Sequence, residues 1–125
     1  MTRVEVFGSI FISLFIVSHC VAILSCARSG RRVAVWAVIA AGGIAVAAAF
    51  AGIGAHHHVG APVILRAGWA AVVMLISWPL ALAAIAVCSV AAYFLLGRNV
   101  TVAVSVGSSF SLDLLYLLSQ FAEMH

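Results

Sequence analysis

The chain has 125 residues, of which 66% are hydrophobic and 7% are charged, and its mean hydropathy is +1.30. A soluble domain needs about a quarter of its residues charged to keep its surface hydrated, so this composition excludes an ordinary soluble protein and indicates lipid as the solvent. All six basic residues are arginine. They form no stripe that could follow a phosphate backbone, which argues against a nucleic-acid partner.

Four apolar stretches are long enough to cross a bilayer, whose hydrocarbon core of about 30 Å takes roughly 20 residues of helix. Backbone amides in lipid must find partners within their own segment, and no alternating pattern indicates a barrel, so each stretch is predicted to be helical. The sequence therefore predicts an all-α, polytopic membrane protein of one domain, with transmembrane helices over residues 4–27, 33–55, 67–97 and 100–121.

The loop after the first helix, RSGRR at residues 28–32, carries three arginines. The positive-inside rule places this loop in the cytoplasm together with Arg98, against the weaker opposing signal of Arg3 and Arg66. We therefore expect a multi-pass protein of the cell inner membrane, with both termini and the loop around residues 56–58 on the outer side.

The second and third helices carry signals for packing and for length. Gly43 and Ala47 in the second helix form a small-residue face that favours close approach of another helix, as in a bundle, a homo-oligomer or a larger membrane complex. The third stretch is longer than the hydrocarbon core at about 1.5 Å per residue. Tilt, a kink at Pro79 or an interfacial first turn around Trp69 must absorb the excess.

Two ionisable residues lie well inside the spans, His19 in the first helix and Asp113 in the fourth. Such groups are costly in lipid and usually face a bundle interior. Counted from the span centres, they differ in depth by about six positions, or roughly 9 Å, so a direct pair is not expected. Asp113 is predicted either to be held by neighbouring serine hydroxyls or to act in a proton or ion relay, and Cys20 is a further candidate for such a site.

The two halves of the chain resemble each other. ILSCARSGRR ends the first helix much as AYFLLGRN ends the third, and each is followed by a helix that runs toward a histidine. We interpret this as two helix-pair repeats in the same, parallel orientation. The histidine run at residues 56–58 and the C-terminal His125 would then share the outer face.

Neutral imidazole is a common ligand for transition metals, and thioether sulfur selects Cu(I). Three successive helical histidines point about 100° apart, so they converge on one ion only where the helix is broken, which Gly54, Gly60 and Pro62 favour. The candidate metal ligands from the loop and the C-terminus are His56, His57, His58, Met124 and His125. The alternative is a polar loop at headgroup level that binds nothing.

The stretch GIGAHHHVGAP, residues 52–62, resembles the signature of the MHYT family, which are bacterial integral-membrane sensor domains built from repeated helix pairs. In that family each outward helix ends in Gly-Ile-x-x-Met-His-aromatic-x-Gly-Met, and His57 falls on the family histidine. The departures from that pattern are His56, His58 and Ala61. The resemblance implies an outer-face site for copper or another transition metal, and the exchange of methionine for histidine favours Cu(II), zinc or nickel over Cu(I).

Three functions follow from these features. The first is a membrane sensor or metal-binding module, which depends on the resemblance. The second is a small accessory or structural subunit of a larger membrane complex, and the third is a minimal ion or proton-coupled transporter that uses Asp113 and His19. No paired carboxylates, activated serine or phosphate loop is present, so the chain is not predicted to be an enzyme.

Overall fold

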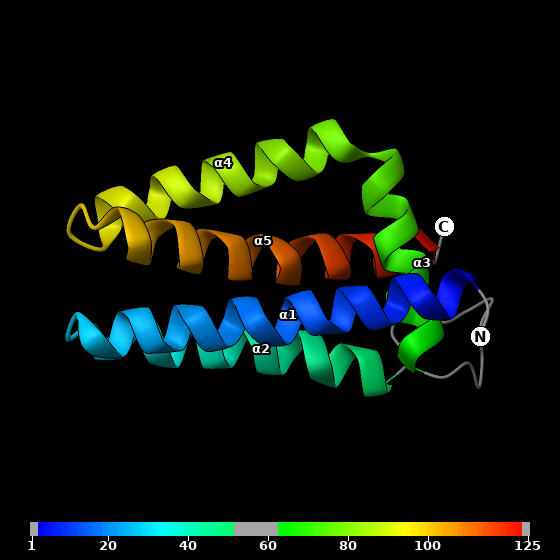
Figure 1. The fold of residues 1–125 in the computed structure, drawn as a ribbon, viewed down its shortest axis with the longest axis horizontal. Helices are drawn as coiled ribbons and strands as arrows, with labels where there is room; N and C mark the ends of the chain where they lie inside the picture. Colours follow the sequence, from blue (N-terminus) through cyan, green and yellow to red (C-terminus); the bar gives the residue numbers. More distant parts are fainter. Residues whose placement is uncertain (1–2, 52–62, 124–125) are drawn as a thin grey trace.

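In the computed structural model, residues 3–51 and 63–123 are described, except for the side chains of residues 51, 122 and 123. Every regular element in these ranges is a helix: α1 (Arg3–Arg28), α2 (Arg32–Ala51), α3 (Val63–Ile76), α4 (Trp78–Leu95) and α5 (Val100–Glu123). Among them, α1, α2, α4 and α5 are long and apolar enough to cross a membrane. The four long helices run along a common direction, and the short α3 lies across one end (Figure 1). The prediction of an all-α, multi-pass membrane protein is confirmed.

The third predicted span, 67–97, is wrong as a single helix. It divides at Ser77 into α3 and α4, with Pro79 in the first turn of α4. Proline has no backbone N–H and its ring collides with the carbonyl four residues earlier, so a straight helix cannot pass through this position. The break confirms the location of the expected kink, and it leaves the 18 residues of α4 as the span while α3 turns across the bundle end.

Both helix hairpins turn at a glycine in the left-handed conformation, although in the second turn Arg98 also has a positive φ, of 62°. Gly30 follows α1 with a φ of 72°, and the Arg31 amide donates to the Cys26 carbonyl at 2.8 Å. Gly97 follows α4 with a φ of 84°, and the Arg98 amide donates to the Tyr93 carbonyl at 2.9 Å. Both are Schellman-type ends, in which glycine takes the left-handed conformation and a late amide closes on the last turn. The two turns lie at the same end of the bundle, as parallel helix pairs require (Figure 1).

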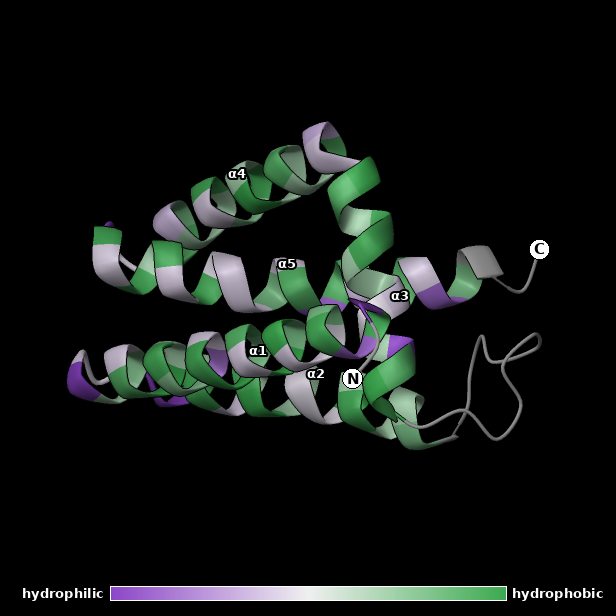
Figure 2. Ribbon diagram, turned by 45° about the vertical axis from the view of Figure 1, so that its right-hand side comes forward, coloured by the Kyte–Doolittle hydropathy of each residue, from purple (hydrophilic) through white to green (hydrophobic). Residues whose placement is uncertain are grey.

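The packing is organised around α5, which contacts each of the other four helices. One apolar cluster lies toward the hairpin turns and includes Cys26, Val38 and Val102. A second lies toward α3 and includes Phe11 and Tyr116. Most of the ribbon is hydrophobic or of intermediate hydropathy, and the strongly hydrophilic residues gather mainly toward the bundle ends (Figure 2). The interior of the bundle thus consists of these two apolar clusters, and the polar residues considered below lie between them.

Glycines set the close approaches between helices. A Cβ on Gly8 of α1 would overlap the Ile64 carbonyl oxygen of α3, and one on Gly68 of α3 would overlap the Val4 carbonyl oxygen of α1. On α2 the packed glycine is Gly42, whereas nothing lies within 4 Å of a Cβ built on Gly43. The small-residue face predicted through Gly43 and Ala47 therefore points outward, and the face one residue earlier packs inside the bundle.

Candidate functional site

His19 of α1 and Asp113 of α5 form a direct pair in the bundle interior. The His19 Nε2 atom lies 3.0 Å from Asp113 Oδ2 and 2.9 Å from Oδ1. The two residues are 9% and 4% exposed, so the contact is shielded from the surface of the chain. The expectation that they are too far apart in depth to pair is wrong.

The pair forms because side chains on a helix lean toward its N-terminus. The two helices run in opposite directions (Figure 1). His19 lies nine residues before the end of α1 and Asp113 lies thirteen residues after the start of α5, so His19 is closer to the hairpin turns. The imidazole leans away from those turns and the carboxylate leans toward them. Both side chains therefore close an axial gap that a count of Cα positions leaves open.

The imidazole is held on three sides. Its Nδ1 atom lies 2.7 Å from the Phe15 carbonyl oxygen, one turn earlier on α1, and its ring stacks on the Phe15 ring with centroids 4.1 Å apart. From α2, Gly42 faces the ring so closely that an added Cβ would lie 2.9 Å from His19 Cδ2. The ring orientation is thus fixed by α1 and α2 before Asp113 is considered.

These contacts determine how the protons are distributed. A carbonyl oxygen only accepts hydrogen bonds, so Nδ1 must carry a proton and donate it to Phe15. One further proton then lies between Nε2 and the carboxylate: either an imidazolium donates to a carboxylate, or a carboxylic acid donates to a neutral imidazole. In both forms the pair has no net charge, which is the form that an apolar bundle favours.

The serines around Asp113 bond elsewhere. Ser109 Oγ donates to the Val106 carbonyl at 2.9 Å, and Ser111 Oγ contacts the carbonyls of Gly107 at 2.6 Å and Ala84 at 3.1 Å. The alternative in which hydroxyls hold the carboxyl is therefore wrong. Both carboxylate oxygens lie within 3.0 Å of His19 Nε2, and Oδ1 has no further hydrogen-bond partner among the described residues.

The cysteine predicted as a further member of this site does not join it. Cys20 is exposed on the outer face of α1, because the residue after a buried helical position turns by about 100° away from it. Cys26 is buried near the hairpin turns and Cys88 is half-buried on α4.

The candidate metal ligands His56, His57, His58, Met124 and His125 lie outside the described residues. Within residues 3–51 and 63–123, no group of three potential metal ligands is found. The outer-face metal site stays a prediction.

A buried arginine was not singled out from the sequence. Arg66 of α3 is buried, and its Nη1 donates to the Ala49 carbonyl near the end of α2. The last carbonyls of a helix have no partner within the helix, and the positive charge of a basic side chain there interacts favourably with the negative end of the helix dipole. A lone arginine beside a helix end was the signal that could have identified this contact.

No protein-family model, no curated protein and no solved structure matches the chain. The resemblance to the MHYT family accordingly stays a prediction, and the site is interpreted from its own geometry.

Proposed function

We propose that the protein is a small proton-coupled membrane transporter in which the His19–Asp113 pair is the coupling group. The observation that supports it is the buried hydrogen bond between α1 and α5, which joins the first helix hairpin to the second. Ionisable residues inside a membrane bundle commonly mark proton or ion pathways. Of the three functions considered, this is the one whose residues the described geometry brings together.

Proton exchange gives the pair a means of changing the bundle. A proton added to the neutral pair leaves an imidazolium beside a carboxylic acid, and a proton removed leaves a neutral imidazole lone pair facing a carboxylate. Either change places a net charge between apolar clusters and weakens the bond between the hairpins. Movement of one hairpin relative to the other would then expose the site and carry a substrate with the proton.

The metal-sensor function depends on ligands outside the described residues, so it remains an independent hypothesis. Metal analysis of the purified protein with and without His57→Ala tests it, and a wild type without bound metal would contradict it. An accessory role predicts co-purification with a larger membrane protein that does not depend on any histidine.

We also propose that the arginine-rich end, which holds both hairpin turns, faces the cytoplasm of the cell inner membrane, with both termini outside. The charge asymmetry between the ends supports this, since Arg28, Arg31, Arg32 and Arg98 all lie at the turns. A C-terminal alkaline phosphatase fusion should be active and a C-terminal green fluorescent protein fusion dark. The reverse pattern would invert the topology.

The coupling role is tested by a pH jump applied to proteoliposomes on a solid-supported membrane. The measurement records the charge that is displaced when the protein binds or releases protons. We expect a transient current in the wild type and a much smaller one in His19→Gln or Asp113→Asn, because each variant removes one of the two titratable groups that share the proton. A wild type without current, or single variants with the wild-type current, would contradict the proposal.

The double variant His19→Gln with Asp113→Asn is the matched control for structure. Its two amides can still hydrogen bond across the same interface, so the bundle should unfold at nearly the wild-type detergent concentration. If the double variant is stable but passes no current, the pair acts through its protons. If it regains the current, the pair is only a structural link.

A further inference from the structure

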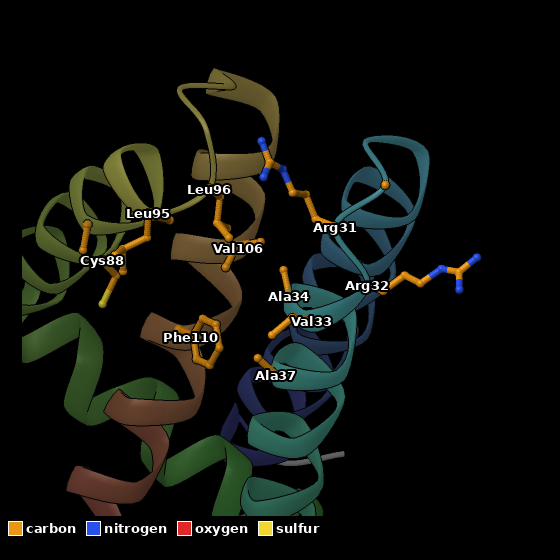
Figure 3. Close-up of a pocket in the computed structure, with 13 residues that line it drawn as sticks. Arg31, Arg32, Val33, Ala34, Ala37, Cys88, Leu95, Leu96, Val106 and Phe110 are labelled. Carbon is orange, nitrogen blue, oxygen red and sulfur yellow. The ribbon is translucent and has the colours of Figure 1, made fainter.

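A groove opens between α2 and α4, close to the hairpin turns. The two helices do not contact each other within the described residues, and α5 forms the floor between them. The groove has a volume of about 720 Å³ and is lined mainly by apolar side chains, including Val33 and Ala37 of α2, Leu95 of α4, and Val106 and Phe110 of α5 (Figure 3). This volume is within the range of about 300–1,000 Å³ that is common for ligand sites.

An arginine lies at the mouth of the groove. Arg31 extends from the α1–α2 turn toward the α4–α5 turn, whereas Arg32 points away from the opening (Figure 3). A Cβ on Gly97 would overlap Arg31 Nη2, so the guanidinium reaches the second turn and spans the mouth. The positive φ of Gly97 and its missing side chain both make room for this contact.

The charge at this end is of one sign. The remaining arginines of the two turns, Arg28 and Arg98, belong to the same end of the bundle. The acidic residues lie elsewhere: Glu5 and Glu123 belong to the opposite helix ends, and Asp113 is paired with His19. An anion at the mouth would therefore meet a guanidinium with several donors and no competing carboxylate.

We infer that this groove binds an anionic phospholipid, with its phosphate against Arg31 and one acyl chain between α2 and α4. The groove runs from Arg31 to Ala37 on α2, which is about 9 Å of depth at 1.5 Å per residue, measured inward from the charged end. That is the direction in which an acyl chain enters the membrane from its headgroup. Basic pockets between transmembrane helices at one membrane surface are typical sites for acidic lipid headgroups.

A second copy of the chain is a poorer occupant. A parallel neighbour would bring its own cluster of arginines to the same membrane surface and place like charges together. A lipid supplies the opposite charge and a thin apolar chain at once. This inference does not depend on the proposed transport function, because the groove and the His19–Asp113 pair share no residue.

The test is lipid retention measured by native mass spectrometry. The protein is reconstituted with equal amounts of phosphatidylglycerol and phosphatidylcholine of identical acyl chains. It is then extracted under mild conditions, and the masses of its complexes with lipid are measured. We expect bound phosphatidylglycerol in excess of phosphatidylcholine. Arg31→Gln should lower that excess about fivefold, while Arg28→Gln, which removes the same charge outside the groove, should change it little.

A second pair of variants tests the groove itself. Ala37→Trp places a large side chain in the groove and should abolish retention of the lipid, whereas Ala47→Trp, on an exposed position of α2 outside the groove, should not. Equal retention of the two lipids by the wild type, equal losses in Arg31→Gln and Arg28→Gln, or no loss in Ala37→Trp would each overturn the inference. So would a dimer that Ala37→Trp converts to a monomer.

Discussion

The interface between α1 and α5 is closed, whereas the space between α2 and α4 is open. At the closed interface a histidine and an aspartate bond directly, with Gly42 of the neighbouring α2 pressed against the imidazole. At the open space the walls are apolar and combine small side chains, such as Ala37 and Ala91, with larger ones, such as Leu95. The two regions belong to the same bundle and share α5.

The difference follows from the solvent. In lipid, burying one apolar side chain against another gains little, because lipid tails are as apolar as leucine. Helices associate where small residues permit close backbone contact or where polar groups find partners. The α1–α5 interface has a polar pair, whereas the α2–α4 space is apolar, so a lipid chain can occupy that space at little cost relative to protein contact.

The largest loss of stability is expected when one partner of the His19–Asp113 pair is removed. Asp113→Leu leaves the buried His19 Nε2 without its partner and should lower the free energy of unfolding by about 3 kcal/mol. The measurement is loss of helicity during titration with a denaturing detergent in mixed micelles. The double variant His19→Leu with Asp113→Leu should recover most of this loss, since a well-packed apolar pair replaces buried polar pairs at little cost. A double variant as unstable as Asp113→Leu would show that packing, not the unpaired imidazole, causes the loss.

A smaller effect is expected from two adjacent glycines on α2. Gly42→Ala forces a Cβ to within 2.9 Å of His19 Cδ2, so the ring must shift and the free energy of unfolding should fall by about 1–2 kcal/mol. Gly43→Ala meets nothing within 4 Å and should be neutral or stabilising by up to about 1 kcal/mol, from lower backbone entropy in the unfolded chain. The same detergent titration compares them, and equal effects would mean that Gly42 does not position the imidazole.

The sequence predicted the architecture because membrane solvation imposes it. Apolar length alone identifies spans, and the Gly-Arg pairs at residues 30–31 and 97–98 marked both hairpin turns. The extent of the third span was missed because a proline after an apolar run is compatible with a kink or with a full break. Packing against α1 through Gly8 and Gly68, together with the Arg66 contact to α2, holds α3 across the bundle end.

The sequence identified the residues of the site but did not predict that they contact each other. His19 and Asp113 were identified because charge in lipid is costly, but their pairing depends on the lean of side chains and on the relative axial shift of two helices. Neither quantity is present in a residue count. The arginine-capped groove was missed for the same reason, since an open space between helices leaves no pattern in the sequence.

The smallest change in stability is expected from a substitution in the open space between α2 and α4. Ala37→Leu enlarges an exposed side chain of α2 that faces the groove, and no residue of α4 packs against α2 there. The free energy of unfolding should change by less than about 0.5 kcal/mol, which is typical of substitutions away from packed contacts. The detergent titration used for Gly42→Ala measures it, and a loss above that range would mean that α2 and α4 close onto each other in the bilayer. In that case the space between them would be a protein interface, and the contrast with the α1–α5 interface would be one of degree.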